Sequence, residues 1–259
     1  MTYILWIMAY GLIYFISEKI SILLGINHVV TVFVMLFYWS IFFGVLYKNG
    51  NAEIYSVNIP KNKLLKSIIY VPLLLMPIIN IVIFISRYCN LEIGIKLSSM
   101  IVLDCSITIL TTLSSVIWEE VSFRGMLPVI LTKWYKMTEL QSAIIASVVF
   151  AAMHILNLFS GEALFDVIVQ MLNAGAVGFC LAIISIREYS IFPCIVIHSL
   201  INISSLFIEW GEELAVVSDR GFLSDFEFEV FWVLPILYVL YGICLCMKGI
   251  DGEKYETLH

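Results

Sequence analysis

The chain has 259 residues, of which 61% are hydrophobic and 13% charged, and its formal net charge is −6. A mean hydropathy of +1.01 excludes an ordinary water-soluble domain and indicates a polytopic helical membrane protein. No basic patch suggests a nucleic-acid partner, and the six cysteines form no CxxC pair. We therefore expect an all-α bundle over residues 1–259, a single integral membrane domain whose surroundings are the lipid bilayer.

Apolar runs long enough to cross about 30 Å of hydrocarbon predict about eight transmembrane helices. They are expected near Tyr3–Leu24, Val29–Tyr47, Leu65–Ile85, Ser106–Leu131, Leu140–Phe159, Ala163–Ile186, Ile191–Ile208 and Val230–Met247. The first run lacks a basic n-region and an obvious cleavage site, so we interpret it as a retained span rather than a signal peptide.

The charges of the connections predict the orientation of the chain. Cations gather in the second, fourth and sixth connections, at Lys48, Lys61, Lys63, Lys66, Lys133, Lys136 and Arg187. The seventh connection, between residues 208 and 230, is acidic. By the positive-inside rule the cationic connections are cytoplasmic, and both termini are then expected in the cytoplasm as well.

The fourth span carries three ionisable side chains, Glu119, Glu120 and Arg124, in the middle of an apolar run. On the insertion scale each such group costs roughly 2.5–3.5 kcal/mol at mid-bilayer, more in total than the apolar residues of the span return. The polar face of this helix must therefore turn toward other helices or a wet cavity. We predict an intramembrane polar cavity, and such residues are by default a hypothesis of function.

Helical spacing divides these three residues into two roles. Glu120 and Arg124 stand four residues apart on one face, where they can pair and reduce each other's desolvation cost. Glu119 points about a hundred degrees away and is expected to keep a free carboxylate. We interpret the Glu120–Arg124 pair as structural support and Glu119 as a candidate base or ligand.

Two more intramembrane side chains have a companion one helical turn away. Phe150 shares a face with His154, and His198 shares one with Asn202. Counting from the cytoplasmic ends of the spans at about 1.5 Å per residue places Glu119 and both histidines at a common depth of roughly 16–21 Å. The sequence therefore predicts one pocket formed by three spans.

A carboxylate, two imidazoles and an amide in a wet pocket suit hydrolysis. The partly desolvated carboxylate takes a proton from water as the water attacks a carbonyl, and neighbouring hydrogen-bond donors stabilise the oxyanion. Alternatively, Glu119, His154 and His198 form a zinc site with an open position, although no HExxH motif is present. We expect no cofactor, with a divalent metal such as zinc as the alternative.

Three motifs carry a resemblance to a known family. They are EExxxR at Glu119–Arg124, FxxxH at Phe150–His154 and HxxxN at His198–Asn202, in this order on separate spans. Together they resemble the intramembrane endopeptidases that include CAAX prenyl proteases and bacteriocin-processing or immunity proteins, the CPBP or Abi family. The resemblance covers roughly residues 106–207, which we take as the catalytic core.

The resemblance implies proteolysis of a leader-type peptide or a prenylated protein at a membrane, here expected to be a bacterial plasma membrane. It implies that Glu119 activates water, that His154 assists, and that His198 and Asn202 form an oxyanion site. Glu120, Arg124 and Phe150 would support that site. Both metal-dependent and glutamate-type mechanisms are argued for the family, and the motifs leave this choice open.

Other classes of function compete with a protease. A non-enzymatic immunity or regulatory protein would bind a bacteriocin or a sensor partner through its spans. An ion-coupled carrier is disfavoured because no inverted repeat or pair of interrupted helices is visible. Asp166, Gln170 and Asn173 lie on one helical face, which we interpret as a site of contact between helices rather than a cavity lining. Small residues four apart are interpreted as sites of close helix packing, namely Ala143, Ser147, Ala151, Ala174 and Gly178.

Overall fold

The computed structural model describes residues 2–24, 28–49, 70–88, 99–188, 190–214 and 223–248, and in these residues it is a bundle of helices without a β-strand. The long helices are α1 (Thr2–Leu24), α2 (Val29–Lys48), α3 (Leu75–Tyr88), α4 (Ser99–Glu120), α6 (Glu139–Met153), α7 (Leu164–Glu188), α8 (Phe192–Leu214) and α9 (Leu223–Lys248). Two π-helical turns, η2 (Val121–Met126) and η3 (Ile130–Trp134), flank the short α5 (Leu127–Val129). A 3₁₀ helix, η4 (His154–Ser160), continues α6.

Each of the eight predicted spans overlaps a helical segment, although residues 65–69 of the third span lie outside the described residues, and the all-α prediction is confirmed. Among the described residues, four helices are long and apolar enough to cross a membrane: Val29–Lys48, Glu139–Phe159, Leu164–Arg187 and Phe192–Trp210. Two shorter apolar helices are Tyr70–Ser86 and Trp232–Met247. The protein is an integral membrane protein. Residues 215–222 of the seventh connection and Lys61, Lys63 and Lys66 of the second lie outside the described residues, so the orientation stays a prediction.

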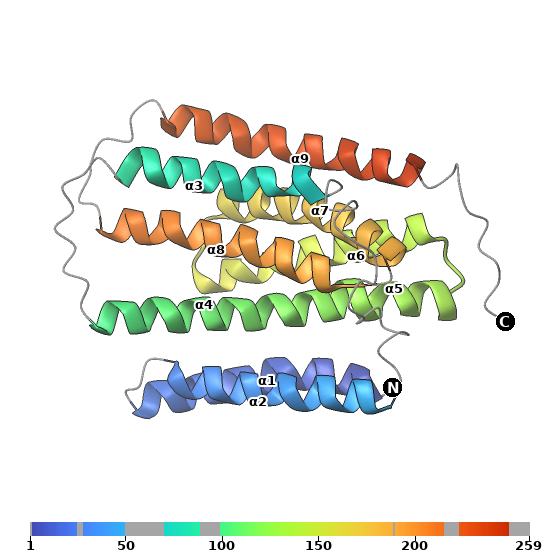
Figure 1. Ribbon diagram of the computed structural model, residues 1–259, viewed down its shortest axis with the longest axis horizontal. Helices are drawn as coiled ribbons and strands as arrows, with labels where there is room; N and C mark the ends of the chain where they lie inside the picture. Colours follow the sequence, from blue (N-terminus) through green and yellow to red (C-terminus); the bar gives the residue numbers. More distant parts are fainter. Residues whose placement is uncertain are drawn as a thin grey trace.

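The helices run along the long axis of the molecule, with α1 and α2 at one side and α3 and α9 at the other (Figure 1). Contacts link them in a chain from α1 through α2, α4 and α8 to α3, and α7 joins α6 to α9. One apolar cluster, which includes Leu73, Leu181 and Tyr238, lies among the later helices. A second, which includes Met35, Phe42 and Val121, joins α1 and α2 to α4.

The distribution of polarity is that of a protein in lipid. Met8, Leu23 and Phe159 are 71%, 85% and 89% exposed, and exposed apolar side chains on this scale mark a surface that contacts hydrocarbon. Charged groups are inside instead, because Glu120 and Arg124 are 0% and 2% exposed. The ionisable face of α4 is therefore turned toward other helices, as its cost in lipid requires.

The segment that follows Glu120 winds as a π-helix, and Pro128 gives a local reason for the irregular winding. Proline lacks the N–H that would bond to the carbonyl four residues earlier, and its ring crowds that carbonyl. The carbonyl in question belongs to Arg124, and the hydroxyl of Ser185 on α7 lies 3.4 Å from it in a hydrogen bond that it shares with the carbonyl of Ala182 at 2.9 Å. Side-chain replacement of a lost backbone bond is how transmembrane helices tolerate proline.

Glycine allows α7 to pack closely against its neighbours. A Cβ at Gly175 would lie 3.3 Å from the Cβ of Ala151 on α6. A Cβ at Gly178 would lie 2.8 Å from a guanidinium nitrogen of Arg124 and 3.2 Å from the ring of Phe150. Gly178, one of the small residues predicted to permit close packing, therefore makes room for two side chains of the candidate site, Arg124 and Phe150.

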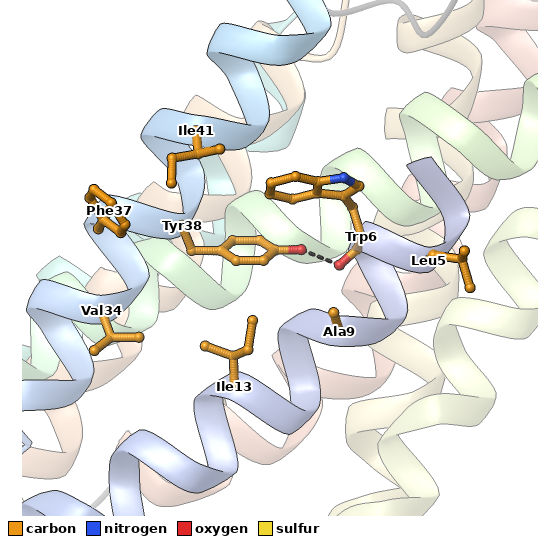
Figure 2. Close-up of a pocket in the computed structure, with 8 residues that line it drawn as sticks. All are labelled: Leu5, Trp6, Ala9, Ile13, Val34, Phe37, Tyr38 and Ile41. Carbon is orange, nitrogen blue, oxygen red and sulfur yellow. Dashed lines mark hydrogen bonds between the residues drawn. The ribbon is translucent and has the colours of Figure 1, made fainter. Parts of the chain in front are cut away.

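An apolar pocket of about 530 Å³ lies between α1 and α2, and its lining is shown in Figure 2. The lining residues are Leu5, Trp6, Ala9, Ile13, Val34, Phe37, Tyr38 and Ile41. The hydroxyl of Tyr38 donates a hydrogen bond to the carbonyl of Trp6 and so joins the two helices there. This pocket contains none of the predicted site residues, and apart from the phenol of Tyr38 and the indole of Trp6 its lining side chains are aliphatic or phenyl groups.

Candidate active site

Two adjacent carboxylates at the end of α4 face one imidazole on α8. The Nδ1 of His198 donates a hydrogen bond of 2.8 Å to Oε1 of Glu120. The Nε2 of the same ring lies 3.5 Å from Oε2 of Glu119. The side chains of Glu119, His198 and Glu120 are 22%, 10% and 0% exposed, so Glu119 is the most accessible of the three.

Helical spacing paired Glu120 with Arg124 and left Glu119 without a partner on its own helix. In the structure both carboxylates also contact His198, which enters from α8. Adjacent helical positions do diverge by about a hundred degrees. The two nitrogens of an imidazole lie on different edges of the ring, however, so a ring inserted between diverging side chains meets both of them.

The predicted pair of Glu120 and Arg124 is present and buried. Nη1 of Arg124 lies 3.0 Å from Oε1 of Glu120, with side-chain exposures of 1% and 0%. The guanidinium also stacks on Phe150, with Cζ 4.1 Å from the ring centroid, a cation–π contact. Phe150 thus supports the charged pair as well as the histidine one turn away on its own helix.

The ring of Phe150 also contacts both histidines. It meets His154 edge to face at a centroid distance of 5.0 Å and His198 at 5.8 Å. His154 begins the 3₁₀ helix η4, and its Nδ1 donates a hydrogen bond of 3.1 Å to the carbonyl oxygen of Phe150. In both histidines Nδ1 therefore has a fixed acceptor, which leaves Nε2 as the nitrogen that can exchange a proton with water or substrate.

Asn202 lies on α8 one turn beyond His198 and is half-buried. Within the part of the chain that the structure describes, no hydrogen bond joins it to the glutamates or to either histidine. Its assignment to the oxyanion site stays a prediction. Ser199 is 7% exposed, and its hydroxyl has no hydrogen-bond partner among the described residues.

The described residues do not form a three-ligand metal site. Among them no three side chains of His, Cys, Asp or Glu lie close enough together to hold one ion, so the alternative set Glu119, His154 and His198 is not assembled as ligands. Glu120 Oε1 already contacts the ring of His198 and the guanidinium of Arg124. The choice between a glutamate-type and a metal-dependent mechanism stays a prediction.

Aromatic packing on the other side of α4 was not predicted. Trp118 stacks on Tyr10 of α1 with ring centroids 5.6 Å apart. Tyr10 is hydrogen-bonded to Ser114 at 3.2 Å, and Nε1 of Trp39 donates to the same hydroxyl at 3.0 Å. These contacts hold the residue before Glu119 against α1 and α2. Nothing in the sequence pairs these residues, because they are separated by up to 108 positions in the chain.

The interhelical interpretation of the polar face on α7 agrees with one contact. Nδ2 of Asn157 in η4 donates a hydrogen bond of 2.7 Å to Oε1 of Gln170, whereas Nδ2 of Asn173 donates one of 3.0 Å within α7, to the carbonyl of Val169. The contact of Asn157 with Gln170 ties the segment that follows His154 to α7.

The fold and the cluster define a class of protein: a helical integral membrane protein with an acid–imidazole site in its interior. Residues 102–204 match the family model of the type II CAAX prenyl endopeptidase Rce1-like family. This match confirms the resemblance that the three motifs predicted, and the matched segment contains every predicted site residue. It supports a CAAX-type protease. No curated protein and no solved structure matches the chain.

Substituting Gly178 tests whether the site depends on this close packing. We expect Gly178→Ala to displace Arg124 and Phe150, to destabilise the fold by about 1–3 kcal/mol and to lower activity, because the new methyl group overlaps both side chains. Gly44→Ala is the matched control, since no atom lies within 4 Å of its Cβ position. Unfolding curves and initial rates measure both effects, and equal behaviour of the two variants would contradict the packing argument.

Proposed function

We propose that this protein is an intramembrane endopeptidase of the CAAX type that hydrolyses a peptide bond with water activated by Glu119. The observation that carries the proposal is the contact between Glu119 and His198. A partly accessible carboxylate lies 3.5 Å from the ring nitrogen of a buried histidine, inside the segment that matches the family. A carboxylate and an imidazole at this separation can exchange a proton directly or through one water molecule.

In the proposed reaction Glu119 takes a proton from water while the water oxygen forms a bond to the carbonyl carbon of the peptide. The carbonyl oxygen becomes an oxyanion, which accepts a hydrogen bond from the amide of Asn202. Because the ring proton of His198 is on Nδ1, Nε2 takes the proton from Glu119, and the resulting Nε2–H donates the second hydrogen bond to the oxyanion. Each such donor typically contributes about 3–4 kcal/mol in the transition state. The tetrahedral intermediate then breaks its C–N bond, and the proton returns from Nε2 of His198 through Glu119 to the leaving amine. His154 assists by binding the attacking water through Nε2.

The family supports a peptide or a prenylated protein as the substrate class. The site lies among helices whose outer surfaces are apolar, so a lipid-modified or apolar peptide can approach it from the bilayer. We therefore propose a farnesylated peptide ending in a CAAX sequence as the first substrate to test, with an unprenylated copy and a double-glycine leader peptide beside it.

The test uses purified full-length protein in liposomes and mass spectrometry of the products. We expect at least one of these peptides to be cleaved at a single bond by the wild-type protein and not by Glu119→Gln. Equal cleavage by the two proteins would contradict the proposal. Binding without cleavage of any peptide would instead favour the non-enzymatic immunity or regulatory function.

A metal-free mechanism makes a separate prediction. We expect the rate of cleavage to be unchanged after incubation with excess chelator, because no step uses a metal ion. A zinc-dependent peptidase in the same liposomes is the control and should lose its activity. Loss of cleavage that zinc restores would show that the glutamate-type mechanism is wrong and would leave the protease assignment intact.

A further inference from the structure

We propose that Glu120 is a positioning residue: it fixes a proton on Nδ1 of His198 and thereby directs Nε2 of that ring toward Glu119 and the reacting groups. Its catalytic consequence rests on the proposed endopeptidase function. Neither the sequence motif nor the family match assigns this contact, since spacing along the helix pairs Glu120 only with Arg124.

The contact itself has the geometry of a strong hydrogen bond. Nδ1 of His198 lies 2.8 Å from Oε1 of Glu120, within the range for charge-assisted bonds. A carboxylate can only accept, so Nδ1 carries the proton. Glu120 is 0% exposed and His198 8% exposed, so no bulk water competes for this position. The proton on Nδ1 is thereby unavailable to the reaction, and Nε2 is the nitrogen that acts.

Glu120 is itself held in place by its other contacts. Its Oε1 lies 3.0 Å from Arg124, whose guanidinium stacks on the ring of Phe150. Phe150 in turn contacts the rings of His154 and His198. Arg124 and Phe150 therefore fix the carboxylate, and the carboxylate fixes the imidazole. Among the described residues, Glu119 and Glu120 on α4 and His154 on η4 interact with His198, and Arg124 on η2 pairs with Glu120.

A purely structural role would give a different arrangement. If Glu120 served only to pair with Arg124, its carboxylate could point toward the guanidinium and away from α8. Instead the same oxygen, Oε1, contacts Arg124 and His198, while Oε2 has no hydrogen-bond partner among the described residues. One oxygen of the carboxylate, Oε1, therefore lies between the guanidinium of Arg124 and the imidazole of His198. This orientation is what positioning of His198 requires.

The test measures the tautomer of His198 by solid-state NMR of protein labelled with ¹⁵N in histidine and reconstituted in bilayers. The chain has four histidines, and the signals of His198 are identified by their loss in His198→Asn. In water a free histidine side chain favours a proton on Nε2. We expect wild-type protein to keep a proton on Nδ1 at every pH at which it stays folded.

Two variants separate positioning from structural pairing. Arg124→Met removes the ion pair and keeps the contact between Glu120 and His198, so the Nδ1 proton should persist. Glu120→Leu/Arg124→Met removes both, leaves no unpaired charge, and should convert neutral His198 to the Nε2–H tautomer. If Arg124→Met does not fold, Glu120→Gln replaces it, because its amide oxygen still accepts from Nδ1 while its charge is lost.

Kinetics of the same variants give the second measurement. We expect the double variant to lose about 10²–10⁴-fold in kcat relative to Arg124→Met or Glu120→Gln with little change in KM, the range for disabling an acid–base group. A wild-type ring with its proton on Nε2 alone, or an unchanged tautomer in the double variant, overturns the proposal. The tautomer needs no substrate, so it is decided even if no peptide is cleaved and the proposed function fails.

Discussion

Replacing Glu119 by glutamine is expected to reduce the rate of peptide cleavage by about 10²–10⁴-fold, the typical contribution of a general base. Glutamine has nearly the same shape and can still meet Nε2 of His198, so the packing of α4 against α8 should persist. It cannot take a proton from water. The loss should therefore appear in kcat, with KM and the thermal unfolding of the protein nearly unchanged.

The control for this experiment is Glu162→Gln. Glu162 is exposed in the connection between η4 and α7, outside the acid–imidazole cluster. The same chemical change there should leave the rate unchanged. Full activity of Glu119→Gln, measured by mass spectrometry of the peptide products over single turnovers, would show that another group activates the water.

Replacing Arg124 by methionine is expected to lower the free energy of unfolding by about 3–5 kcal/mol, the cost of leaving one partner of a buried ion pair alone. Glu120 would keep its carboxylate at a position with 0% exposure, and Phe150 would lose its cation–π contact. The effect should be among the largest of any single substitution in the chain, because the pair lies in a region from which water is largely excluded.

Removing both charges should reverse most of this loss. Well-packed apolar residues in place of a buried ion pair are often neutral or stabilising, so Glu120→Leu/Arg124→Met is expected to be more stable than Arg124→Met. Lys133→Ala, at an exposed position, serves as the control and should change stability by less than about 0.5 kcal/mol. Unfolding by denaturant in detergent micelles measures all three variants. Wild-type stability of Arg124→Met would contradict the assignment of a buried, functional pair.

The positions of the helices and the candidate residues could be predicted from the sequence for one physical reason. In hydrocarbon every backbone polar group must be satisfied within the segment, so an apolar run of sufficient length becomes a helix. The same cost makes each intramembrane charge conspicuous. Glu119, Glu120, Arg124 and the two histidines are visible because the bilayer tolerates such groups only when they face the interior.

The irregular winding of η2, which follows α4, could be predicted in part from the sequence. Pro128 lies four residues beyond Arg124, and proline at that spacing always removes one backbone hydrogen bond from a helix. A disturbance at the carbonyl of Arg124 follows from this rule alone. Its satisfaction by Ser185 does not, because a hydroxyl 61 positions away becomes a partner only after α7 has packed against this turn.

The amino-acid sequence by itself determined that this protein is a helical membrane bundle, and it identified which side chains are too polar to face lipid. Depth along the spans predicted one shared pocket, but only the tertiary structure decided which side chains contact each other in it. Periodicity along one helix relates residues three or four positions apart, so it paired Glu120 with Arg124 and separated Glu119 from both. The ring of His198 comes from α8 and contacts a carboxylate with each of its two nitrogens. Such a contact depends on how the two helices are rotated and how deep each lies, and the sequence of one helix does not determine either.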